Sequence, residues 1–252
     1  MKLNYKSPLI GTVLLGAVTL TSGCKSYDDV AAHYSSKHIK ANTNQVKAQI
    51  PEVTELGYIV LALTDAGKNY VNTNSPYYDE VIKHFGAFKN HKAVEMLNED
   101  LKENAETFSH FRNGLYAFTI NKNERIVLKP DYRIDLNRVD FRRYTGALAD
   151  FMGDSKFREF YNAHKDFYSK METAQSQGLT MSAAWNTVGK NKKYAKPFQS
   201  YQVIMSPLMK GASSTLSISG RGFSECLIFA ESTDKALAIT PAKTTTQALL
   251  NE

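Results

Sequence analysis

The residues of this chain that could do chemistry are its six histidines, its two cysteines and a few serines that stand beside glycines. A zinc peptidase commonly carries two histidines four residues apart on a helix, because that spacing lets both grip one metal ion while a neighbouring glutamate acts on the bound water. No two histidines of this chain are four residues apart. The sequence therefore predicts no metal site and no cofactor, and no catalytic residue can be assigned to His33, His38, His84, His91, His110 or His164.

Three of these histidines suit surface positions. His84 and His91 are seven residues apart and would share a face only on one straight helix, so we interpret them as loop or surface residues rather than metal ligands. His110 follows Glu106 by four residues, a spacing that predicts a solvent-facing pair on one helix.

Two further features resemble catalytic groups only in part. His164 lies on an aromatic stripe, and we expect a core or half-buried histidine bonded to a neighbour such as Tyr168 rather than a catalytic base. The segment SISGRG at 217–222 mimics the Gly-x-Ser-x-Gly turn of serine hydrolases, but no histidine and acid are placed to serve it. We interpret it as a turn between strands.

The two cysteines have different settings. Cys226 lies in the apolar run ECLIF, which favours an inert, buried thiol. Cys24 follows a basic leader at 1–6, an apolar run at 8–20 and the small residues TSG, the pattern of a secretory signal. The run is too short to span a membrane. Small residues leading into a cysteine resemble the lipobox of bacterial lipoproteins; the alternatives are an ordinary cleaved signal with an incidental cysteine, or a leader that is never cut.

The lipobox resemblance implies lipidation of Cys24 after removal of residues 1–23, so the expected partner is a membrane and the expected place is the cell envelope, on the periplasmic or the outer surface of the outer membrane. Residues 24–49 are polar and predict a tether. The net charge falls from +6 to a mild +4 when Lys2 and Lys6 leave with the signal, and the basic residues are spread among acids, which argues against nucleic acid as a partner.

Apolar periodicity predicts the elements of the remaining chain. Helices are expected from Pro51 and from Pro76, along a continuous stripe from Val94 to Phe111, and across 141–153 and 155–171. Residues 115–120 and 125–128 predict a β-hairpin, and the residues after 200 predict strands. The fold class is therefore α+β, with one domain at 50–230 and a weakly ordered or truncated tail at 231–252.

Several segments together resemble an uncharacterised family of Bacteroidota lipoproteins. They are PEVTEL at 51–56, LALTD at 61–65, NSPYY at 74–78, FREFYNAH at 157–164 and YQVIMSPL at 201–208, with Tyr168, Trp185 and Gly211. Longer members of that family look similar to zinc-metallopeptidase folds, with a metal-binding helix beyond the segment that ends here. The resemblance implies a front part of such a domain, without the helix that carries the metal.

These observations predict a lipid-anchored envelope protein. Its peptidase-like domain is expected to be truncated and to have no catalytic activity. The alternative is a binding or scaffold lipoprotein that presents a groove near the aromatic helix at 157–168 to a peptide or a glycan. A metal-dependent hydrolase is the lesser alternative.

Overall fold

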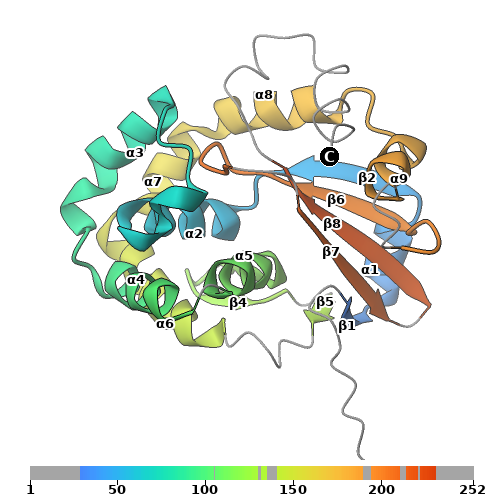
Figure 1. Ribbon diagram of the computed structural model, residues 1–252, viewed down its shortest axis with the longest axis horizontal. Coiled ribbons are helices and arrows are strands. Elements are labelled where there is room, and N and C mark those ends of the chain that lie inside the picture. Colours follow the sequence, from blue (N-terminus) through green and yellow to red (C-terminus); the bar gives the residue numbers. More distant parts are fainter. Residues whose placement is uncertain are drawn as a thin grey trace, which may run out of the picture.

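The computed structural model describes residues 29–104, 106–129, 132–134, 141–189, 194–210, 214–220 and 222–230. The predicted signal peptide at 1–23, Cys24 and the predicted tail at 231–252 lie outside the described residues. Within them, helices pack around a mixed six-stranded sheet of order β2-β6-β8-β7-β1-β5, and a separate two-stranded sheet joins β3 and β4 (Figure 1). The prediction of an α+β fold is confirmed.

The strands are short. They are β1 (Asp29–Tyr34), β2 (Gln45–Gln49), β3 (Phe118–Ile120), β4 (Ile126–Leu128), β5 (Tyr132–Ile134), β6 (Ser200–Ile204), β7 (Ser214–Gly220) and β8 (Phe223–Phe229). The helices are α1 (Ser36–Asn42), α2 (Glu52–Leu63), α3 (Pro76–Phe85), α4 (Lys92–Glu103), α5 (Thr107–Ala117), α6 (Arg142–Asp154), α7 (Phe157–Ala163), α8 (Lys165–Ser176) and α9 (Met181–Gly189), with 3₁₀ turns η1 (Ala66–Tyr70) and η2 (Gly86–Phe88). In the described part of the chain, no helix has the length and apolar character needed to cross a bilayer.

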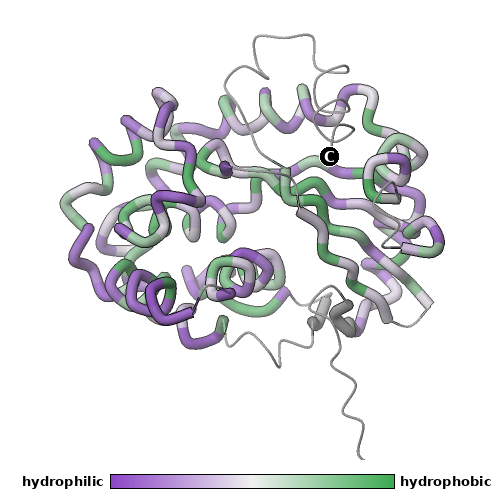
Figure 2. Tube along the Cα trace, in the orientation of Figure 1, coloured by the Kyte–Doolittle hydropathy of each residue, from purple (hydrophilic) through white to green (hydrophobic). Residues whose placement is uncertain are grey.

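The sheet mixes two directions of pairing. β2, β6 and β8 run parallel to one another, β7 is antiparallel to β8, and β1 runs parallel to β7. Strands β6 and β8 are buried on both faces, as expected for strands in the middle of a covered sheet. Helices α8 and α9 lie on one side, and α5 with the β3-β4 pair lies on the other (Figure 1). Hydrophobic residues follow these central strands, and hydrophilic residues dominate the outer turns of α4 (Figure 2).

The predicted tether at 24–49 is wrong for residues 29–49. These residues form β1, α1 and β2, and both strands pair within the main sheet. The segment looked polar because α1 has an exposed side and β2 is an edge strand, so only some of its side chains are buried. Tyr34 is one of them, with 1% of its surface exposed.

Helix starts follow the local signals more closely. Ser75 caps α3 by accepting a hydrogen bond from the Tyr78 backbone N–H at 3.1 Å, and Pro76 takes the first helical position, as the sequence predicts. Pro51 precedes α2 directly.

Three boundaries differ from expectation. The stripe from Val94 to Phe111 is divided between α4 and α5, because Asn104 leaves helical conformation and its side chain accepts from the Glu106 N–H. Helix α5 then runs through Gly114 to Ala117, so the strand expected from 115 begins only at Phe118. The helix expected at 155–171 is divided into α7 and α8.

Candidate functional site

A groove of about 590 Å³ opens between the loop at 194–199 and the β7-β8 hairpin, and we call it the hairpin groove. The hairpin turns tightly at Gly222, whose φ of 74° suits glycine. Of the segment 217–222 that we interpreted as a turn, residues 217–220 instead belong to strand β7, and the turn comes at its end, at Gly222. Besides aromatic residues, glycines, an alanine and a proline, the groove is lined by the polar residues Ser217, Ser219, Ser224, Gln199 and Lys196.

The wall formed by the loop is held against the strands by Gln199. Its side-chain oxygen accepts from the Ser224 N–H at 2.8 Å, and its own N–H donates to the Ser224 carbonyl at 3.0 Å. The rings of Tyr194 and Phe198 meet edge to face at 4.8 Å, and the Tyr194 hydroxyl lies 3.3 Å from Thr215 Oγ1. These contacts fix the shape of the groove without a ligand.

Lys196 is the one charged residue among the described lining residues of the hairpin groove, and its side chain is exposed. Phe198 and Phe223 are 7% and 2% exposed, so they support the walls from within rather than offering open ring faces. The arrangement suits a polar ligand that carries hydroxyl groups and a negative charge.

A buried carboxylate, Glu225, follows Ser224 on β8 and therefore lies on the opposite face of the strand. Its Oε2 accepts from Gln202 Nε2 at 3.2 Å and from Ser200 Oγ at 3.4 Å, and lies 3.5 Å from His38 Nε2. Its Oε1 accepts from the Tyr116 hydroxyl at 3.4 Å. This set of donors satisfies a group that would otherwise be costly to bury.

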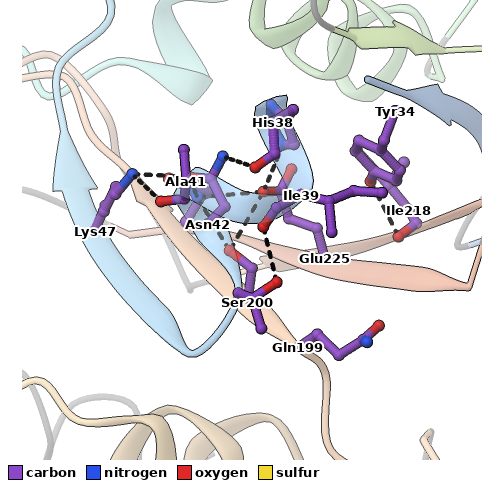
Figure 3. A network of polar contacts seen from close by, with 12 residues as sticks. Tyr34, His38, Ile39, Ala41, Asn42, Lys47, Gln199, Ser200, Ile218 and Glu225 are labelled. Carbon is purple, nitrogen blue, oxygen red and sulfur yellow. Dashed lines mark hydrogen bonds and ion pairs between the residues drawn. The ribbon is translucent and has the colours of Figure 1, made fainter. Parts of the chain in front are cut away.

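The network around Glu225 extends to two lysines. Lys47 donates to Asn42 Oδ1 at 2.8 Å (Figure 3). The side-chain amide of Gln202 links Asn42 to the carboxylate. Lys129 Nζ lies 3.7 Å from the centre of the Tyr116 ring, and burial lowers its pKa to about 8, against the opposing effect of the Glu225 charge. Ser200 is fully buried, so its hydroxyl is not accessible, and the network stabilises the packing of α1 and α5 on the sheet.

A second buried carboxylate, Glu55, lies in the first turn of α2, just beyond the end of β2. The Tyr77 hydroxyl donates to Glu55 Oε1 at 2.7 Å and lies 2.5 Å from the Tyr168 hydroxyl. Burial raises the pKa of Glu55 to about 7, and the side chains of Tyr77, Ser206 and His164 oppose that rise.

The histidines take positions of several kinds. His91 caps α4 by accepting from the Ala93 N–H, His84 Nε2 lies 3.3 Å from the Ser155 carbonyl, and His110 Nε2 lies 3.6 Å from Glu106 Oε2. The predicted Glu106–His110 pair is thus present. Among the described residues, no three histidine, cysteine, aspartate or glutamate side chains come together in a way that could hold a metal ion.

His164 is half-buried, as predicted, but its partners differ from the expected Tyr168. Its Nδ1 lies 2.8 Å from the Phe160 carbonyl, and its Nε2 lies 2.8 Å from Glu80 Oε2. Phe157, Phe160 and Tyr168 of the aromatic stripe near which we expected a groove are buried in the core. Cys226 is fully buried, as predicted.

Sequence reasoning missed Glu55, Glu225 and the hairpin groove. A weak signal existed for the two carboxylates, since each directly precedes a run of apolar residues that predicts a buried element. The hairpin groove had none, because its two walls are separate in the sequence. Comparison with known proteins finds no match to a family model, to a curated protein or to a solved structure.

Proposed function

We propose that this chain is a lipid-anchored protein of the cell envelope whose folded domain binds a saccharide with an acidic group in the hairpin groove. The leader and Cys24 support the anchor. The observation that carries the binding function is the lining of the groove, which combines serine hydroxyls, the Gln199 amide and the Lys196 ammonium in about 590 Å³. That volume lies within the range of about 300–1,000 Å³ common among small-ligand sites.

The lining favours a saccharide over a peptide. An extended peptide commonly binds by adding a strand to a free sheet edge, and pockets for its side chains give specificity. Strand β7 is paired on one side with β8 and on the other with β1, so the groove floor offers no such edge. Hydroxyl and amide groups instead match the many hydroxyls of a sugar, and Lys196 matches a carboxylate.

A peptidase-like domain without catalytic activity is the second candidate, and one observation favours it. Three of the segments that resemble the lipoprotein family form, together with Tyr168, a single cluster around Glu55, to which Tyr77 and Ser206 contribute. The resemblance thus concerns residues that form one structural unit. Stoichiometric zinc in the purified protein, measured by atomic absorption, would instead favour the metal-dependent hydrolase.

Binding is tested by calorimetric titration of the detergent-solubilised protein with tri-galacturonic acid. The neutral galactose trisaccharide and an acidic tripeptide serve as comparison ligands. We expect Lys196→Ala to weaken binding of the acidic sugar about 10–100-fold, the loss typical of a charged hydrogen bond. Lys89→Ala, which removes an exposed lysine from another surface, is the matched control. Equal binding by both variants, or preference for the tripeptide, would contradict the proposal.

The anchor is tested by Cys24→Ala in the full-length chain. We expect an uncleaved precursor without lipid, seen by mass spectrometry and by loss of lipoprotein processing. Cys226→Ala leaves the leader intact and is the control. Normal processing and membrane partitioning of Cys24→Ala would contradict lipidation.

A further inference from the structure

The chain joins the folded body at Asp29, only a few residues after Cys24. Strand β1 begins at Asp29, which pairs with Ser217 of β7. Farther along β1, the Tyr34 hydroxyl donates to the Ile218 carbonyl at 3.3 Å, and the Tyr34 ring meets Phe223 edge to face at 4.9 Å. The N-terminal segment therefore belongs to the sheet.

This attachment leaves a very short connection to the expected lipid. Four residues, 25–28, separate Cys24 from Asp29, and a fully extended chain of that length reaches about 17 Å. A folded body of about 200 residues is about 40 Å across. The connection is therefore shorter than the body is wide, whereas a free tether up to residue 49 would have reached about twice that width.

The attachment point also has a definite place on the body. Strands β1 and β5 lie together at one end of the sheet, and α3 lies across the molecule from them (Figure 1). If the α3 side faced the membrane, Asp29 would stand roughly one body width away from it, beyond the reach of about 17 Å. A lipid on Cys24 thus restricts which side can meet the bilayer.

We propose that the end of the molecule formed by β1, β5 and β7 lies against the bilayer surface and that the α3 side faces away. This inference rests on the proposed lipidation. It also places the hairpin groove near the membrane, because Ser217 and Ser219 of its floor are the residues that pair with Asp29 and Ala31. Neighbouring strands are about 4.8 Å apart, so Ser217 lies within about 22 Å of Cys24. The ligand of the groove is then one displayed close to the bilayer.

The test measures two heights above the membrane. A donor dye is attached to Ser219→Cys or to Lys83→Cys; both positions are exposed, the first on β7 and the second on α3. The buried Cys226 stays in place, and the chain without an added cysteine gives the background labelling. Each lipidated protein is inserted into phosphatidylethanolamine–phosphatidylglycerol vesicles that carry an acceptor dye on the lipid headgroup, and energy transfer is recorded.

We expect at least twofold higher transfer efficiency from position 219 than from position 83. Inserting twenty Gly/Ser residues between Ser26 and Tyr27 should shrink this difference, because the longer connection lets the body turn. Equal transfer from both positions in a vesicle-bound, lipidated protein would overturn the orientation and leave the anchor intact. A purified protein without lipid, identified by mass spectrometry, would overturn the anchor and the orientation together.

Discussion

The Tyr77 hydroxyl donates to Glu55 Oε1 at 2.7 Å across the contact between α3 and α2. Glu55 is fully buried, and Tyr77 is 5% exposed. The contact therefore joins a carboxyl group and a phenol in the core, in a cluster that also includes Tyr168. The contribution of this contact to the free energy of unfolding can be measured by varying the pH and by substitutions that remove single atoms.

Glu55 should make stability depend on pH. Its pKa is raised to about 7 in the folded protein from an ordinary value of 4.5, so between these values the folded state binds more protons than the unfolded state. The free energy of unfolding should therefore fall as pH rises from about 4.5 to about 7, by about 3 kcal/mol. Urea unfolding at pH 5 and pH 8 measures this difference.

Replacing the Glu55 carboxyl group distinguishes its contribution to the pH dependence from that of other titrating groups. Glu55→Gln should lose most of the slope, whereas Glu99→Gln, at an exposed position on α4, should keep it. A Glu55→Gln protein with the full wild-type slope would show that another group causes the pH dependence.

Tyr77→Phe should lower the free energy of unfolding by about 1–3 kcal/mol. The substitution keeps the ring but removes the hydroxyl that pairs with Glu55 and Tyr168, and it leaves buried oxygen atoms with fewer partners. Tyr70→Phe, in which the ring can still stack on Phe108, is the matched control and should cost less. Similar losses in the two variants, measured by urea unfolding at pH 7, would argue against the hydroxyl contact as the cause.

Glu225→Ala should cost about 3–5 kcal/mol, because the donors of Ser200, Gln202 and Tyr116 would lose a common acceptor in the core. Glu225→Gln keeps the shape and one oxygen acceptor, and should cost less than half as much. Thermal unfolding of the three proteins measures the order. If alanine were tolerated as well as glutamine, the network would contribute little to stability.

Substitution of alanine for a glycine should change the stability of the fold in opposite directions in α5 and α6. A Cβ at Gly114 would lie 2.7 Å from Phe141, so Gly114→Ala should destabilise the fold by about 1–3 kcal/mol. A Cβ at Gly146 meets nothing within 4 Å, so Gly146→Ala should be neutral or stabilise the fold by up to about 1 kcal/mol. Circular-dichroism melts compare the two variants. Equal effects would mean that helix propensity, rather than the approach of α5 to Phe141, decides both.

Local signals in the sequence were enough for much of the helical part. The proline at the start of α3, the apolar stripes and the hairpin turn act over a few residues, and the structure has an element at each of them. The buried state of Cys226 also followed from its neighbours in the chain. Boundaries such as Asn104 and the continuation of α5 past Gly114 were missed, because propensity does not decide where packing extends or ends a helix.

The sequence by itself determined the leader pattern, the Cys24 motif, the fold class and the positions of most elements, since each of these depends on the order and period of nearby side chains. Only the tertiary structure decided that residues 29–49 join the sheet, that Glu55 and Glu225 are buried with partners, and that a groove opens beside β7. These features join distant segments: Tyr34 bonds to Ile218, 184 residues away. Such pairings depend on which buried surfaces and hydrogen-bonding edges fit together in space, and no local pattern carries that information.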